Sequence, residues 1–252
     1  MNLRLPVLAA AMAMLLAACR TAAPIPPQAI EYNAEGAKVL EAGDLDRAQR
    51  LFELALEYCA DYPDPHNNLC LVWKMRGELG KAKAECIKAL RLFGDFAIAH
   101  SNLGTVYLQE KRFRDARDSF RAALKIDPGY VEARYNLCLS YLHLGEARDA
   151  RECYLKLIEV NARKTDAYHD LCILDLQDGK PLAAIENCTR AVELDPKYAR
   201  AFLHLGMAYA AVGKSCEARA AFHSCLLLEA GNVECAEALA RTGGAGCEEA
   251  AR

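Results

Sequence analysis

A repeat of 34 residues constrains this chain of 252 residues more than any other feature of its sequence. A small residue recurs at that spacing, at Gly36, Cys70, Gly104, Cys138, Cys172 and Gly206. An alanine stands twelve residues after each of them, at Ala48, Ala82, Ala116, Ala150, Ala184 and Ala218. A fixed period of this length is typical of repeat architectures, in which each unit buries its apolar face against its neighbours.

Each period holds two stretches with apolar residues at helical spacing, separated by a break at Gly43, Gly77, Gly145, Gly179 or Gly213. Aromatic residues such as Phe52, Phe120 and Phe222 stand four residues after the alanine, and two periods close with Asp-Pro. The pattern resembles the tetratricopeptide repeat over residues 29–232. That resemblance implies an all-α fold, a right-handed α-solenoid of six helix-turn-helix repeats with a C-terminal cap helix. The repeats are expected at 29–62, 63–96, 97–130, 131–164, 165–198 and 199–232, followed by a cap helix and tail at 233–252.

The N-terminus predicts export and lipid attachment. Residues 1–18 carry one cation and then an apolar run that is too short to span a bilayer, as in a lipoprotein signal peptide. The residues Leu16-Ala17-Ala18-Cys19 resemble the lipobox of bacterial lipoproteins, with Cys19 as the lipidated residue; a cysteine beside an ordinary cleavage site is the alternative. Because Arg20 rather than aspartate follows, analogy with lipoprotein sorting implies the periplasmic face of the outer membrane. Residues 19–28 form the lipidated cysteine and a Pro-rich tether, and the tether residues 20–28 are expected to reach only about 28 Å, which would keep the folded part near the membrane.

Composition and motifs argue against several classes of function. The net charge of −3 and the pI of about 6.1 disfavour nucleic-acid binding. The sequence contains no phosphate-binding loop, Gly-x-Ser-x-Gly or His-Glu-x-x-His motif, so we expect no enzymatic activity and no small-molecule substrate. No Cys-x-x-Cys is present and the six histidines are scattered, which disfavours metal or thiol chemistry. We expect no metal and no cofactor apart from the covalent lipid on Cys19.

The chain has twelve cysteines, and the cysteines of an exported chain other than the lipidated Cys19 are expected to pair where an even number allows it. The two helices of a repeat run antiparallel about a turn near position 16, so positions 8 and 24 face each other. This register predicts disulfides inside three hairpins: Cys70–Cys86, Cys138–Cys153 and Cys172–Cys188. Antiparallel packing of the last repeat helix on the cap predicts Cys225–Cys235 and Cys216–Cys247, although Gly243-Gly244-Ala245-Gly246 could carry Cys247 away. Cys59 is left unpaired. Each bridge inside a hairpin closes a short loop and is expected to contribute on the order of 3 kcal/mol.

The tetratricopeptide resemblance also implies a binding surface, because in that family the first helix of each repeat lines the concave face. The corresponding residues here form a largely apolar set: Asn67, Leu71, Met75, Leu108, Tyr135, Leu139, Leu142, Ile173, Leu176 and Met207. Exposed apolar patches mark interaction sites, although these side chains could instead fill gaps between neighbouring hairpins. The polar clamp with which some relatives hold a C-terminal carboxylate is absent, so an amphipathic helix or apolar peptide is the expected ligand.

A lipobox, a short tether and six repeats together resemble the pilotins of type IV pilus secretins, the group that includes PilF, PilW and Tgl. The cysteines within Asn67-Asn68-Leu69-Cys70 and Tyr135-Asn136-Leu137-Cys138 make the resemblance to Tgl closest. It implies that the chain binds secretin subunits and promotes their insertion and multimerisation in the outer membrane for pilus assembly and motility. Two alternatives stay open: a lipoprotein scaffold for β-barrel assembly or peptidoglycan enzymes, and a regulatory subunit of an envelope enzyme or a surface adhesin.

Overall fold

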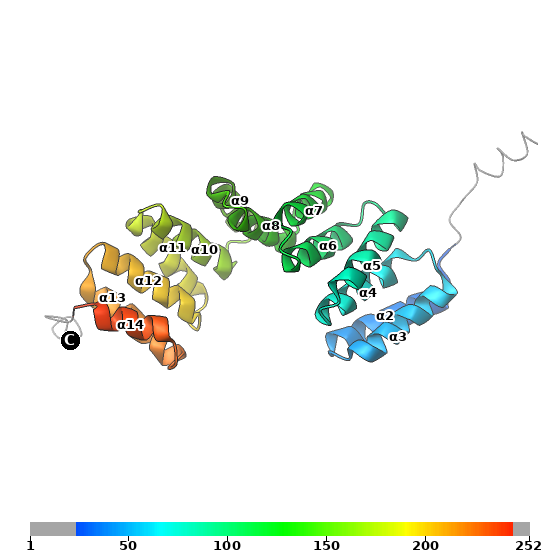
Figure 1. Ribbon diagram of the computed structural model, residues 1–252, viewed down its shortest axis with the longest axis horizontal. Coiled ribbons are helices and arrows are strands. Elements are labelled where there is room, and N and C mark those ends of the chain that lie inside the picture. Colours follow the sequence, from blue (N-terminus) through cyan, green and yellow to red (C-terminus); the bar gives the residue numbers. More distant parts are fainter. Residues whose placement is uncertain (1–23, 244–252) are drawn as a thin grey trace, which may run out of the picture. The chain divides into compact units, whose positions relative to one another are not determined.

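The computed structural model describes residues 24–243, and over this range the fold consists of helices joined by short turns, with no strand. Thirteen helices follow one another within the described residues: α2 (Pro27–Glu41), α3 (Leu45–Tyr58), α4 (Pro63–Met75), α5 (Leu79–Leu92), α6 (Ala97–Gln109), α7 (Phe113–Ile126), α8 (Val131–His143), α9 (Ala147–Val160), α10 (Thr165–Gln177), α11 (Pro181–Leu194), α12 (Ala199–Ala211), α13 (Ser215–Leu228) and α14 (Val233–Arg241). The all-α repeat architecture expected from the sequence is therefore confirmed. Consecutive helices from α2 to α13 pair into hairpins, each made of a first helix A and a second helix B (Figure 1).

The helices fall into two compact units, one containing α2–α5 and the other α6–α14. In the first unit Leu40, Phe52, Leu69 and Val72 form the core. In the second unit one apolar cluster joins α7 to α10, a second joins α10 to α13, and a third joins α12 to α14. Each hairpin therefore buries its apolar face against its neighbours, as expected for stacked repeats. No helix in the range 24–243 has the length and apolar character needed to cross a membrane.

The turn inside each hairpin requires one residue in the left-handed region of backbone space. Five hairpins place glycine there, at Gly43, Gly77, Gly145, Gly179 and Gly213, with φ between +67° and +85°. The third hairpin has Lys111 at the same position, with φ of +57°. A side chain makes this conformation cost roughly 1–2 kcal/mol, whereas glycine adopts it without a steric penalty. Lys111 is thus a strained point of the second unit.

Replacing Lys111 with glycine is expected to stabilise the protein by about 0.5–1 kcal/mol, because relief of strain exceeds the extra backbone entropy that glycine loses on folding. The free energy of unfolding in urea measures this change. Lys111→Ala is the matched control, since alanine removes the same side chain but keeps the strain, and it should give no gain. An equal gain from both variants would show that the lysine side chain, and not the backbone, is unfavourable.

Two different arrangements fill the space between the helices of a hairpin. Three repeats combine glycine on the first helix with a buried phenylalanine on the second: Gly36 with Phe52, Gly104 with Phe120, and Gly206 with Phe222. A Cβ atom on these glycines would lie only 2.6, 2.7 and 2.4 Å from the ring. The other three repeats place a cysteine on each helix and join the two by a disulfide. The glycine is required wherever the ring occupies the space.

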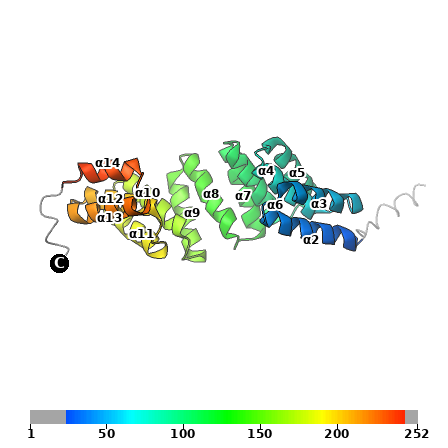
Figure 2. The ribbon, with the colours of Figure 1, turned by 90° about the horizontal axis from the view of Figure 1, so that it is seen from below.

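The cap helix α14 is fixed to the last hairpin at both of its ends. At its start the Asn232 side chain accepts a hydrogen bond from the backbone N–H of Cys235 at 3.0 Å, and Cys235 is bonded to Cys225 on α13. At its end the Arg219 guanidinium on α13 donates to the backbone carbonyl of Thr242 at 2.9 Å. Figure 2 shows α12, α13 and α14 side by side at the C-terminal end of the second unit. The cap helix consequently has a defined position on α13.

Candidate functional site

The structure places eight cysteines in four disulfides among the described residues. Three join the helices of a single hairpin, Cys70–Cys86, Cys138–Cys153 and Cys172–Cys188, with Cα–Cα distances of 5.2, 5.4 and 5.4 Å. The fourth, Cys225–Cys235, joins α13 to α14 with a Cα–Cα distance of 6.3 Å. Cys59, at the end of α3, is a free cysteine. Cys19 and the Cys216–Cys247 pairing involve residues 1–23 and 244–252, which lie outside the described part of the chain.

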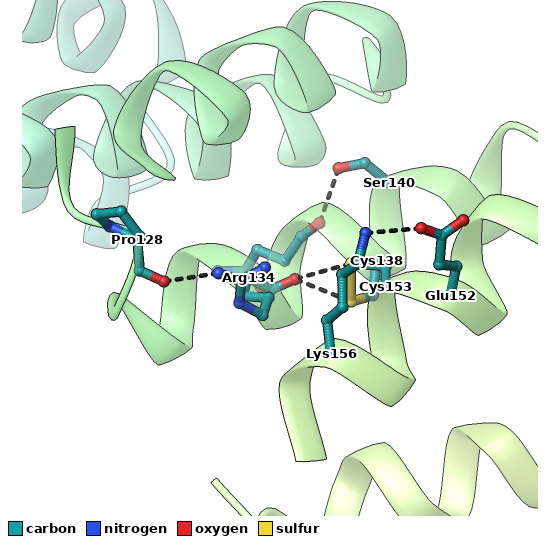
Figure 3. The surroundings of a disulfide bond; sticks show 8 residues. Pro128, Arg134, Cys138, Ser140, Glu152, Cys153 and Lys156 are labelled. Atoms are coloured by element: carbon teal, nitrogen blue, oxygen red, sulfur yellow. Dashed lines mark hydrogen bonds and ion pairs between the residues drawn. A yellow bond between two sulfur atoms is a disulfide. The ribbon is translucent and has the colours of Figure 1, made fainter. Parts of the chain in front are cut away.

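The surroundings of Cys138–Cys153 are those of a structural bridge (Figure 3). The backbone carbonyl oxygen of Arg134, one turn before Cys138 on α8, lies 3.0 and 3.5 Å from the two sulfurs. Sulfurs bonded to each other carry no hydrogen, so these are packing contacts rather than hydrogen bonds. The Arg134 guanidinium donates instead to the Pro128 carbonyl at 2.6 Å. Both cysteines are buried in this packing, which suits a structural role better than thiol exchange.

The residues expected on the binding face of the first unit differ in exposure. Asn67 is buried, and Leu71 packs against the core of that unit. Met75, in contrast, is 53% exposed. The accessible binding surface of this unit is therefore limited to Met75 and the exposed part of Leu71, because the buried Asn67 offers little area to a partner.

In the second unit the expected binding residues separate into two groups by their place in the repeat. Leu108, Tyr135 and Leu142 pack against the cluster that joins α7 to α10, and Leu176 packs against the cluster that joins α10 to α13. These four side chains therefore fill gaps between hairpins, which was the alternative to a binding role in the sequence analysis. The residues at position 9 of α8, α10 and α12 form the second group and are partly or well exposed: Leu139, Ile173 and Met207, the last 39% exposed. This group is called the position-9 row below.

A pocket of about 600 Å³ lies beside the position-9 row, between α10, α12 and α14. Ile173 and Leu203 provide apolar lining, and Val233 at the start of α14 provides another side. Two histidines complete this part: the Nε2 atom of His169 lies 3.1 Å from the Nδ1 atom of His204. Residues from two A helices and the cap thus converge on one concave site, a common arrangement for ligand binding.

The polar groups around this pocket are paired within the fold. The Nδ1 atom of His169 lies 3.2 Å from the Tyr198 hydroxyl, and the Nδ1 atom of His204 lies 2.8 Å from the Arg200 carbonyl. Burial lowers the pKa of His204, which keeps its imidazole uncharged near pH 7. Burial, and then the charge of Asp166, raises the pKa of Tyr198 to about 12. Because these polar atoms are engaged within the fold, the histidines contribute uncharged ring surface to the pocket at neutral pH.

A buried ion pair between neighbouring repeats was not anticipated from the sequence. Asp175 on α10 is only 2% exposed, and its Oδ1 accepts from the Arg151 guanidinium on α9 at 2.6 Å. Its second oxygen accepts from the Asn187 side-chain amide on α11 at 2.7 Å, and Arg151 also reaches Asp178 at 2.9 Å. The network joins three consecutive helices. No group of three or more histidine, cysteine, aspartate or glutamate side chains within 24–243 is arranged to hold a metal ion.

Replacing Arg151 with methionine is expected to cost about 2–3 kcal/mol of stability. The substitution leaves the buried Asp175 carboxylate with the neutral Asn187 amide as its hydrogen-bond donor, and an uncompensated buried charge is strongly destabilising. Urea denaturation of the two proteins measures the loss. Arg148→Met is the matched control, because Arg148 lies on the exposed side of the same helix and should change the free energy of unfolding by less than about 0.5 kcal/mol. Similar losses in both variants would show that the ion pair adds nothing.

Comparison with known proteins relates the chain to repeat proteins. One tetratricopeptide-repeat model matches residues 107–172, and a second matches 76–131 and 169–224. No curated protein matches the sequence. The solved structure of PilF from Pseudomonas aeruginosa is similar at 21% identity with a TM-score of 0.77, covering 84% of this chain and 97% of that one.

Two further solved structures show the same type of fold. YrrB, described as a TPR protein with an unusual peptide-binding site, is similar at 24% identity with a TM-score of 0.63, covering 74% of this chain and 96% of that one. MamA from Desulfovibrio magneticus is similar at 20% identity with a TM-score of 0.62, covering 69% of this chain and 98% of that one. At sequence identities of 20–24%, these similarities establish the fold alone.

Proposed function

This chain belongs to the tetratricopeptide-repeat family, whose members bind peptides or proteins, and we propose that it acts as a pilotin. In this proposal it is a lipoprotein anchored by Cys19 to the periplasmic face of the outer membrane. It binds secretin subunits and promotes their insertion and multimerisation there, for type IV pilus assembly and pilus-dependent motility. It acts by binding, without catalysis and without a cofactor other than its lipid.

The position-9 row is the observation that carries the proposal. Leu139, Ile173 and Met207 recur at the same place on three successive A helices and keep exposed apolar surface. The four other apolar residues expected on this face of the unit are packed against its core. Apolar surface that repeats in register and is not used for packing favours an extended protein ligand.

The N-terminal sequence and the comparison with PilF support the proposed location and client. If Cys19 is lipidated as proposed, the tether that follows would keep the repeats within about 28 Å of the membrane. The structural similarity to PilF extends over 97% of the PilF chain. A membrane-proximal repeat protein suits a client that assembles in the same membrane.

A strain lacking this protein is expected to lose heat-resistant secretin multimers and surface pili, as seen on immunoblots and by microscopy; unchanged multimers reject the proposal.

A mature protein carrying Leu139→Asp and Ile173→Asp should bind purified secretin at least about tenfold more weakly, because two apolar contacts are lost and two charges are introduced. Leu155→Asp, on the exposed surface of α9, is the matched control and should bind as the unchanged protein does. Circular dichroism checks that all variants are folded.

A further inference from the structure

The pocket between α10, α12 and α14 continues the position-9 row at the C-terminal end of the second unit. Ile173 belongs to the row and also lines the pocket, together with Leu203 on the next A helix. Val233 completes the apolar lining from the cap helix and is 65% exposed. Here it extends an apolar surface into a hollow large enough for a bulky side chain.

The outer part of the pocket carries an excess of negative charge. Glu229 and Glu234 contribute carboxylates, and Arg200 contributes one cation. The Asn232 amide donates to the Glu229 carboxylate at 2.8 Å, which fixes its position, and no ion pair holds Glu234 within the described residues. The nearby His204 is uncharged at neutral pH because burial lowers its pKa. A cationic ligand group would therefore be favoured at this rim.

The wall formed by α14 depends on a disulfide. Val233 and Glu234 directly precede Cys235, which is bonded to Cys225 on α13. The bridge is the covalent link that holds the first turn of α14 against α13, and the Asn232 cap is the adjoining hydrogen bond. The position of this wall therefore depends in part on the oxidised Cys225–Cys235 pair.

We infer that this pocket holds the anchor of the client: an apolar side chain seated on Ile173, Leu203 and Val233, next to a lysine or arginine that pairs with Glu234. The inference rests on the proposed function, since it assumes a protein client on this face, and it adds the site and the chemistry of the anchor. The Cys225–Cys235 bridge acts as a positioning element for that site.

Two fluorescein-labelled peptides test the anchor chemistry with the mature, full-length protein. They share one leucine-rich sequence and differ only in carrying lysine or glutamate beside the leucines. Fluorescence anisotropy is expected to show tighter binding of the lysine peptide, with a preference that weakens as salt increases. Absence of lysine-peptide binding up to about 1 mM, or a preference for the glutamate peptide, overturns the inference.

Substitutions at the rim give sharper outcomes without disturbing the fold. Val233→Asn should weaken lysine-peptide binding about fivefold through lost apolar contact. Glu234→Lys should reverse the preference between the two peptides. Leu182→Asn and Glu186→Lys are the matched controls, because both residues are exposed on α11, away from the pocket, and should leave binding unchanged. Equal binding by the Val233 variant and the unchanged protein excludes this pocket as the anchor site.

Removing the bridge tests its positioning role. A variant with Cys225→Ala and Cys235→Ala should bind the lysine peptide at least about fivefold more weakly while keeping the helical signal of the remaining repeats. The equivalent Cys138→Ala and Cys153→Ala variant removes a bridge far along the same unit and should keep peptide binding. If the peptides fail to bind but Leu139→Asp with Ile173→Asp still weakens secretin binding about tenfold, the anchor site is wrong and the proposed function stands. If the deletion strain keeps its multimers, the proposed function fails, and the peptide measurements still decide whether the pocket binds such a ligand.

Discussion

Adding a thiol reductant is expected to remove most of the stability of this protein. Each hairpin disulfide closes a loop of 15 or 16 residues, and a loop of that size contributes about 3 kcal/mol. The three hairpin bridges together approach the whole stability of an ordinary domain, about 5–15 kcal/mol. Urea denaturation with and without dithiothreitol, followed by circular dichroism, measures the effect. A midpoint that is unchanged on full reduction, checked by thiol titration, would contradict it.

A variant that exchanges one hairpin arrangement for the other provides the matched control. Cys70→Gly with Cys86→Phe, and Cys172→Gly with Cys188→Phe, rebuild two disulfide hairpins in the glycine and phenylalanine form. Because the ring then fills the space between the helices, the variant is expected to depend less on oxidation and to keep more of its stability in dithiothreitol than the unchanged protein. The alanine versions of the same four positions should not recover stability, since they leave a void where the bridge was.

Replacing Gly206 with alanine is expected to destabilise the second unit by about 3 kcal/mol. The new Cβ would clash with the Phe222 ring, which is buried in the core of this unit. Thermal and urea unfolding both measure the change. Combining Gly206→Ala with Phe222→Leu should recover part of the loss, because the smaller side chain gives the methyl group space.

Gly80→Ala is the matched control for this prediction. Gly80 lies within α5, and a Cβ atom there would meet nothing within 4 Å. Alanine is the better helix former, so this variant is expected to gain about 0.5–1 kcal/mol. Opposite signs for the two substitutions attribute the cost at Gly206 to the ring contact. A loss at both positions would point instead to a general intolerance of alanine.

The sequence predicted the helical hairpins and their register because both depend on residues that recur every 34 positions. The same register identifies Lys111 as the counterpart of five turn glycines, and it brings Cys70 opposite Cys86 at a spacing suited to a bridge. The Arg151–Asp175 pair could not be found in this way. It joins residues of different repeats that read as ordinary surface charges, and its burial depends on how α9, α10 and α11 pack.

The binding face was predicted only in part, for a related reason. The repeat pattern selects the helix face but does not distinguish Leu139, which keeps exposed surface, from Leu142, which packs against the core one turn later. That difference depends on the distance between neighbouring hairpins. The pocket beside α14 was likewise not predicted, since its wall belongs to the cap and not to a repeat.

The two hairpin arrangements also restrict how such a chain can change by mutation. Consider a repeat that has glycine and phenylalanine at these positions, as at Gly104 and Phe120. If the glycine changes to cysteine first, the new Cβ atom clashes with the ring. A first change on the phenylalanine side leaves a hole and an unpaired thiol. Either single step gives a less stable repeat, so an ancestor needed spare stability from its other hairpins to pass between the two forms. In a chain of six such repeats, the other hairpins are the source of that spare stability.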